Sequence, residues 1–271
     1  MSTIPLSVPR PAMPRDDFSA LIALSLTLSI VFALALGSDP RTLDLAPVWL
    51  KPLHFALSFI LYFATLALVV RRLSPQVRAG WPLRATTLAI AVAYLAEIGY
   101  IAIQAARAER SHFNLSDPVH TALYAAMGVG AVTLVVGVTV IGALVARDAD
   151  FAAGPRSRQG IVLGFAMTLP LTLIVAGYMS SSGSHWVGTP QPGGATVPLM
   201  GWSLTVGDLR PAHFVSIHAM QALPLMGLWL DRRGSTDRRL LWGAAAIWSI
   251  LCLALFLQAL MGLPLIPHWV A

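Results

Sequence analysis

Ionisable side chains inside apolar stretches are the residues of this chain best suited to chemistry. Glu97 interrupts one apolar run, and His54 and His218 interrupt two others. Such residues are costly within a bilayer, so they mark functional sites by default. A helix rises 1.5 Å per residue, which puts both histidines roughly 10 Å and Glu97 roughly 13 Å below the same membrane surface. This common depth predicts one polar site in one half of the membrane.

Further polar residues surround these three at helical spacing. Lys51 precedes His54 by three positions and Gln221 follows His218 by three, so each pair shares a helix face. The candidate site contains Glu97 as the catalytic residue, Lys51, His54, Gln104, Arg210 and Gln221 as ligand-binding residues, and His54, His120, His213 and His218 as metal ligands.

These residue types suit three kinds of chemistry. A b-type haem needs an axial histidine on each of two helices, which His54 and His218 supply, with Lys51 and Arg210 near its propionates. A copper, zinc or iron ion would suit Glu97 with two or three histidines. A proton relay through Glu97 and the histidines would instead serve transport. No compact metal-binding motif chooses among these possibilities.

Composition indicates the elements that must position these residues. Of the 271 residues, 56% are hydrophobic and only 11% are charged, whereas soluble domains carry about 25% charge. So few charges indicate a multi-span membrane protein and exclude a secreted disulfide scaffold, a nucleic-acid-binding protein and a cytosolic enzyme. The single cysteine, Cys252, excludes an internal disulfide.

Hydropathy predicts an all-α bundle of seven transmembrane helices in a single domain. A segment of roughly 20 apolar residues is long enough to cross a bilayer, and it must be helical because lipid cannot satisfy open backbone groups. The expected helices cover about 18–37, 47–70, 84–106, 118–146, 159–180, 211–230 and 240–263.

The distribution of basic residues predicts the orientation of the bundle. Alternate gaps hold thirteen arginines, and the remaining gaps hold five Lys or Arg residues. The positive-inside rule then places the N-terminus in the cytoplasm and the C-terminus outside a bacterial inner membrane. A cleaved signal peptide is the competing interpretation of the first run. The histidines all fall in the outer half, and the long outer gap 181–209 is expected to fold back as a capping loop.

Three stretches of the sequence resemble an uncharacterised family of bacterial multi-pass membrane proteins. They are WLKPLHF at 49–55, QAAR at 104–107 with SHFN at 111–114, and GWS at 201–203 with GDLR at 207–210, HF at 213–214 and HAMQ at 218–221. The resemblance runs from the second to the sixth expected helix. It implies that these outer segments form one functional unit, and it carries no activity.

The leading hypothesis is a membrane protein with a His- and Glu-lined site in the outer leaflet and a redox role. The site would hold a b-type haem or a Cu, Zn or Fe ion, and a small molecule or quinone would reach it from outside. One alternative is a proton-coupled transporter or channel that uses Glu97 and the histidines. Another is a non-catalytic subunit that binds partners in a membrane complex.

Overall fold

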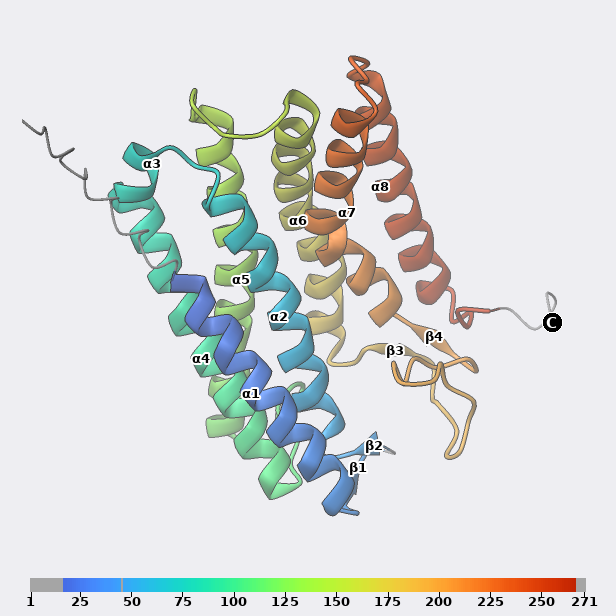
Figure 1. Cartoon of the computed structure of the whole chain (residues 1–271). Helices are drawn as coiled ribbons and strands as arrows, with labels where there is room; N and C mark the ends of the chain where they lie inside the picture. Colours follow the sequence, from blue (N-terminus) through green and yellow to red (C-terminus); the bar gives the residue numbers. More distant parts are fainter. Residues whose placement is uncertain (1–16, 45, 267–271) are drawn as a thin grey trace, which may run out of the picture.

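The computed structural model describes residues 17–44 and 46–266, which form a helical bundle (Figure 1). Arg10, Arg15 and His268, used above in counting charges and histidines, lie outside these residues. The elements are α1 (Asp17–Ser38), β1 (Thr42–Leu43), β2 (Ala46–Pro47), α2 (Leu50–Val70), α3 (Pro75–Ala79), α4 (Trp81–Arg107), α5 (Pro118–Arg147), α6 (Pro155–Ser182), β3 (Trp186–Val187), β4 (Gly207–Asp208), α7 (Arg210–Arg232) and α8 (Arg239–Leu260).

Each of the seven expected helices is present, and local chemistry explains the ends that differ. α2 begins later than expected because Pro47 pairs with Thr42 in a short antiparallel ladder. α8 stops earlier because Gly262 adopts a positive φ of 73°, a conformation that ends helices. At the start of α5, Asp117 caps the helix by accepting hydrogen bonds from two backbone N–H groups, and Pro118 occupies the first turn.

Six helices of the described part are long and apolar enough to cross a membrane: α1, α2, α4, α5, α6 and α8. α7 has 23 residues but falls outside this set, because His213, His218, Gln221 and Pro224 make it more polar. The expected count of seven spans is therefore not confirmed. Six apolar helices do support a multi-pass membrane protein.

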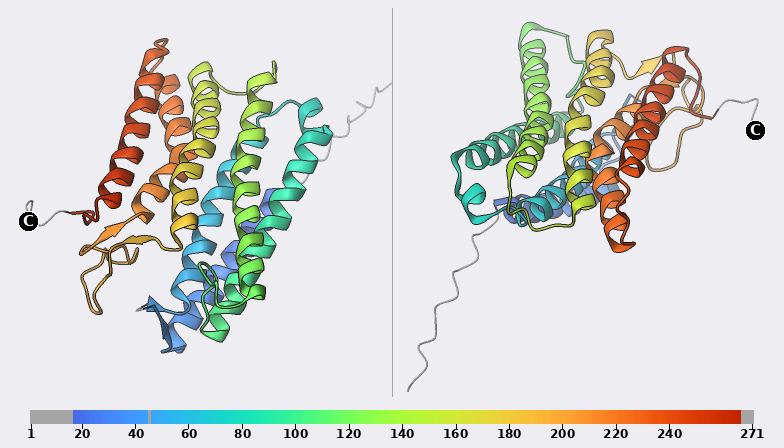
Figure 2. Two further views of the ribbon diagram at one scale, coloured as in Figure 1. Left: turned by 180° about the vertical axis from the view of Figure 1, so that it is seen from behind. Right: turned by 90° about the horizontal axis from the view of Figure 1, so that it is seen from above.

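Consecutive long helices pack side by side (Figures 1 and 2). The most extensive contact joins α6 to α7, and α7 also packs on α8. α6 and α7 come close because two glycines of α6 face the α7 backbone. A Cβ on Gly160 would lie 2.3 Å from the carbonyl oxygen of Leu223, and a Cβ on Gly164 would lie 2.5 Å from the carbonyl oxygen of Ala219. Small residues let two helix backbones approach in this way. α2 meets α4 over a much shorter stretch.

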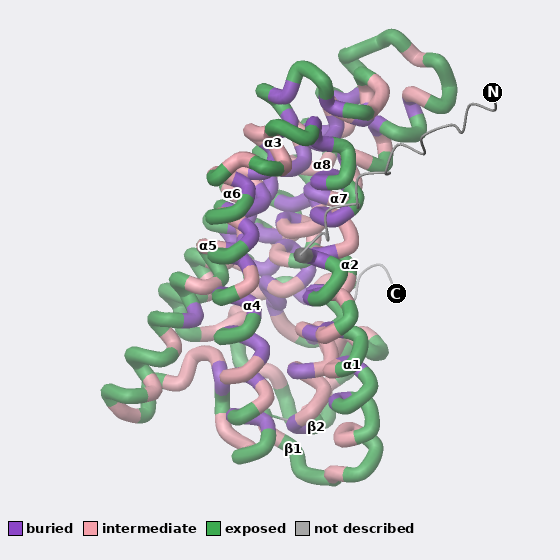
Figure 3. Tube along the Cα trace, turned by 60° about the vertical axis from the view of Figure 1, so that its left-hand side comes forward, coloured by how far each residue is buried: buried purple, intermediate pink, exposed green. Residues whose placement is uncertain are grey.

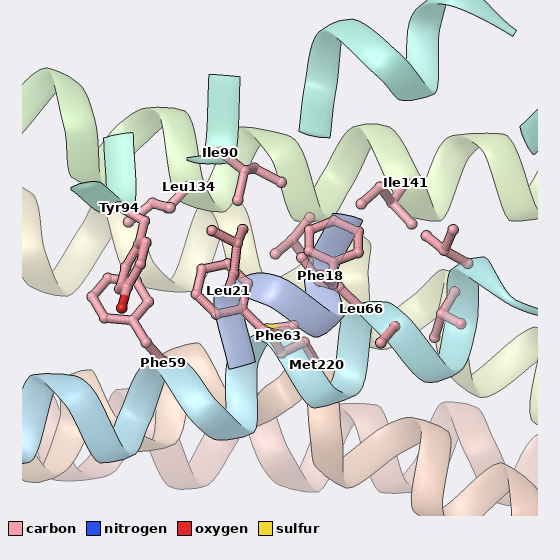
Figure 4. Packing of buried hydrophobic residues seen from close by; sticks show 14 of the residues in the cluster. Phe18, Leu21, Phe59, Phe63, Leu66, Ile90, Tyr94, Leu134, Ile141 and Met220 are labelled. Carbon is pink, nitrogen blue, oxygen red and sulfur yellow. The ribbon is translucent and has the colours of Figure 1, made fainter. Parts of the chain in front are cut away.

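The larger buried core lies among α1, α2, α4, α5 and α6 (Figure 4). The Tyr94 ring meets Phe59 and Phe63 edge-on, with ring centroids 4.7 and 4.9 Å away. Its hydroxyl lies 2.8 Å from the Ser25 hydroxyl. Residues on the outward helix faces are mostly exposed (Figure 3), and many of them are large and apolar, such as Leu34 at 70% exposure. Such faces suit contact with lipid.

The two ends of the bundle differ in their connections. One end carries α3 and the α5–α6 and α7–α8 connections, and the other carries the four strands and the α4–α5 connection (Figure 1). We call the second the histidine end, because His54, His112, His185 and His213 lie in or next to its connections. The candidate site is built there.

Candidate functional site

Glu97 is a buried carboxylate on the side of α4 that faces α5. It is 3% exposed, and a Cβ on Gly130 of α5 would lie only 2.6 Å from its Oε1 atom. Glycine at this position therefore leaves the room that the carboxylate occupies. Oε1 is buried and has no hydrogen-bond partner among the described residues. Buried polar groups are usually satisfied, so each exception needs an explanation.

Lys51, in the first turn of α2, is the charged neighbour of Glu97. Its charge interacts with Glu97 and also with Asp44 and Arg210. Asp44 is held by Arg110, with the closest atoms 2.6 Å apart, and Arg210 is held by Asp208 at the same distance. Within the described residues, Lys51 itself forms no hydrogen bond or direct ion pair. Lys51 and Glu97 are thus the two charges here without a direct partner.

His112, in the α4–α5 connection, reaches the same region. Its ring centroid lies 5.6 Å from that of Phe55 on α2 and 6.2 Å from that of Tyr124 on α5. Burial holds the pKa of His112 well below its usual range, and the charges of Lys51, His213 and His185 lower it further. His112 is therefore a neutral imidazole at pH 7.

Two more histidines approach His112 from separate segments. His185 follows α6 and packs at a tilt against Trp186, with 4.1 Å between ring centroids, while His213 belongs to the first turn of α7. Nε2 of His185, Nδ1 of His213 and Nε1 of Trp186 are all buried without a hydrogen-bond partner in the described residues. Burial, with the nearby Arg210 charge, lowers the pKa of His185 to about 4. These neutral rings can exchange hydrogen bonds with a bound molecule.

The segment 183–209 connects α6 to α7 at the histidine end and is anchored by Arg210. The guanidinium donates to the Asp208 carboxylate and to the Gly201 carbonyl, and it lies over the Trp186 ring at 6.0 Å. Trp202 packs edge-on against Phe214 of α7. Arg210 therefore holds this loop in place, whereas the sequence suggested a ligand contact.

His54 and His218, the expected haem ligands, occupy different surroundings. The backbone of Leu199 comes within hydrogen-bonding reach of His54. His218 Nδ1 lies 3.1 Å from Gln221 Oε1, and Gln221 donates to the Thr65 hydroxyl of α2 over 3.1 Å. The pair His218 and Gln221 shares a face as expected and bridges α7 to α2. No hydrogen bond or ring contact joins His54 to His218 in the part of the chain described.

His120 and Gln104 belong to a second polar network, between α4 and α5. The His120 ring contacts the carboxylates of Asp117 and Glu109. Gln104 donates to Glu109 over 3.3 Å and to the Arg110 carbonyl over 3.0 Å. The structure thus gathers these two predicted residues around Glu109. It brings Lys51 and His213 into the surroundings of His112, and Glu97 interacts with Lys51.

The expected metal ligands do not form one cluster. Among residues 17–44 and 46–266, no group of three or more His, Cys, Asp or Glu side chains could hold a metal ion. Two residues of the site, His112 and His185, were read from the sequence only as outer-loop residues. A signal for them exists, because each is followed by an aromatic residue, as His54 and His213 are.

Comparison with known proteins adds no relative: no family model, no curated protein and no solved structure matches this chain. The interpretation of the site therefore depends on its own geometry.

Proposed function

We propose that this chain is a seven-span protein of the bacterial inner membrane that moves a small solute together with protons. The N-terminus lies in the cytoplasm, and the histidine end faces outside. The thirteen-to-five distribution of basic residues supports this orientation.

The packing of α7 supports a seventh span. Its 23 residues correspond to about 35 Å of helix, which exceeds a hydrocarbon core of about 30 Å. Its backbone is in contact with that of α6 at Gly160 and Gly164. Its polar residues His218 and Gln221 are engaged with each other and with Thr65. A helix joined this closely to a membrane-crossing neighbour has its polar groups covered by protein.

The observation that carries the proton-coupled function is the buried, unpartnered Glu97 opposite Lys51. A carboxylate among apolar helices is stable either as an ion beside a cation or as a neutral acid. Moving the Lys51 charge therefore changes whether Glu97 holds a proton. The neutral rings of His112, His185 and His213 supply further proton-accepting nitrogens toward the outside.

Reconstitution into proteoliposomes loaded with a pH-sensitive dye tests this function. The probes are one solute of each charge class: sodium L-lactate, choline chloride and glycerol. We expect one of them to drive proton movement that disappears in Glu97→Gln. The same change at Glu109, a half-exposed carboxylate paired with Arg107, is expected to leave that movement intact. The proposal would be contradicted if none of the three probes drove more proton movement in proteoliposomes than in protein-free vesicles.

A bound haem or metal is a second candidate, favoured by the unpartnered ring nitrogens of His185 and His213, which are ligand atoms for both. A haem there would supply one-electron redox chemistry. The absorption spectrum and elemental analysis of purified protein test this candidate. It predicts a Soret band or bound transition metal that is lost in His213→Ala and retained in His120→Ala. A colourless, metal-free protein would exclude it.

A further inference from the structure

We propose that the transported solute is a small carboxylate anion, which Lys51 and the unpartnered donors at the histidine end bind while Glu97 takes up one proton. This inference rests on the proposed function and names the class of solute. It follows from the unpartnered buried groups at the histidine end and from the balance of charge around Lys51.

Several buried polar groups at the histidine end have no hydrogen-bond partner among the described residues. The indole N–H of Trp186 can only donate, and Lys51 carries three donating hydrogens. His185 and His213 each add one unpartnered ring nitrogen. Glu97 Oε1 is an acceptor, but it faces Gly130 on α5. A carboxylate brings two oxygens with about four acceptor sites, and charge-assisted hydrogen bonds of this kind are short and strong.

Charge balance links the anion to a proton. The charged groups facing Lys51 are Asp44, Arg210 and Glu97, and the first two are already neutralised by Arg110 and Asp208. Lys51 can therefore neutralise either Glu97 or an incoming anion. Once the anion is bound, an ionised Glu97 would lie buried beside a second negative charge, which is unfavourable.

A single proton resolves this conflict. An O–H bond forms on the Glu97 carboxylate, no other bond changes, and no electron is transferred. The anion and the proton thus enter as a neutral pair. Release of the anion returns Lys51 to Glu97, which then gives up its proton.

The inference is tested by measuring binding and proton uptake together. The full chain in detergent, weakly buffered at pH 7, is titrated with sodium L-lactate, while equilibrium dialysis of labelled lactate counts the bound anion and an indicator dye counts protons. We expect about one proton per lactate in the wild type. Glu97→Gln is expected to bind lactate without taking up a proton, and Lys51→Gln to bind it at least about tenfold more weakly.

Three variants serve as controls. Glu109→Gln and Arg107→Gln remove the two partners of an exposed ion pair at the same end and are expected to leave binding and proton uptake unchanged. Should Lys51→Gln fail to elute as a single species on gel filtration, Lys51→Arg, which keeps the charge, is compared with the wild type. It is expected to retain binding within about tenfold.

The failures of the two proposals are distinguishable. Lactate binding that is unaffected by Lys51→Gln, or binding without proton uptake in the wild type, overturns the anion inference. Choline or glycerol that drives Glu97-dependent proton movement in vesicles, with no binding of lactate, overturns the anion inference and retains the proposed function. Proton movement that responds to none of the probes overturns both.

Discussion

The close approach of Gly130 to Glu97 leads to a prediction about stability. An alanine in a helix interior is about 1 kcal/mol more favourable than a glycine. Gly128, two positions earlier on α5, has nothing within 4 Å of an added Cβ. We therefore expect Gly128→Ala to stabilise the protein by about 1 kcal/mol.

Gly130→Ala is expected to lose that gain. Its methyl group would lie 2.6 Å from Glu97 Oε1 and 3.4 Å from Cδ, so the carboxylate must rotate away. Forcing a side chain off its preferred rotamer costs about 0.5–1.5 kcal/mol, which offsets the helix gain. The net change is then close to zero. The two alanine variants should differ by about 1 kcal/mol, or roughly 2–4 °C in melting temperature for a chain near this size.

The assay is thermal unfolding of both variants in detergent, alone and combined with Glu97→Ala. Removing the Glu97 side chain removes the clash, so Gly130→Ala should regain the full stabilisation in that background. The size of this rescue is the coupling energy between the two positions. Gly130→Ala that stabilises the protein as much as Gly128→Ala in both backgrounds would refute the placement of Glu97 against α5.

Three further predictions concern packing, capping and pH. Gly164→Val should destabilise the protein by about 1–3 kcal/mol, because its Cβ would lie 2.5 Å from the Ala219 carbonyl oxygen. Gly177→Val is the control, since nothing lies within 4 Å of an added Cβ there. The melting temperatures of the two variants test the difference. Asp231→Asn should cost about 0.5–2 kcal/mol, because the Asp231 carboxylate accepts two backbone N–H groups of the first turn of α6; urea unfolding measures the loss. The lowered pKa of His185, about 4 against 6.5 when unfolded, means that the unfolded chain binds the extra proton. The free energy of unfolding should therefore fall as pH drops from 6.5 to 4, and it should fall less in His185→Gln. A wild-type free energy that falls no more steeply with pH than that of His185→Gln would contradict this.

The helices could be predicted from the sequence because lipid imposes a simple requirement on length. The uncharged run at 118–146 became α5, Pro118–Arg147, with one residue of difference. The ends that differed were those fixed by tertiary or turn geometry, such as the ladder at Pro47 and the positive φ of Gly262. α7 was harder to classify, because Gln221, which His218 contacts, donates to Thr65 of α2, and hydropathy does not record such a contact between helices.

The site was predictable only where its residues lie on helices. Depth grouped Glu97 with His54 and His218, and helical spacing added Lys51 to His54. In the structure the Lys51 charge interacts with Glu97. The positions of His112 and His185 depend on how two connections fold back, which helical periodicity cannot give. His120 shows the reverse case, since Asp117, three residues earlier, is the helix cap and also binds the His120 ring. That local pairing could have been read from the sequence.

The tight seam between α6 and α7 also determines where the bundle is easiest to deform. Close backbone approach at Gly160 and the Asp231 cap hold these two helices together. The α1–α2 pair packs on α4 over a shorter contact, and single hydrogen bonds of Tyr62 and Thr65 join α2 to α5 and α7. Lys51 lies on α2 of that pair, whereas Glu97 lies on α4. A small rocking movement of two helices would therefore lengthen or shorten the gap between these charges without unwinding a single turn.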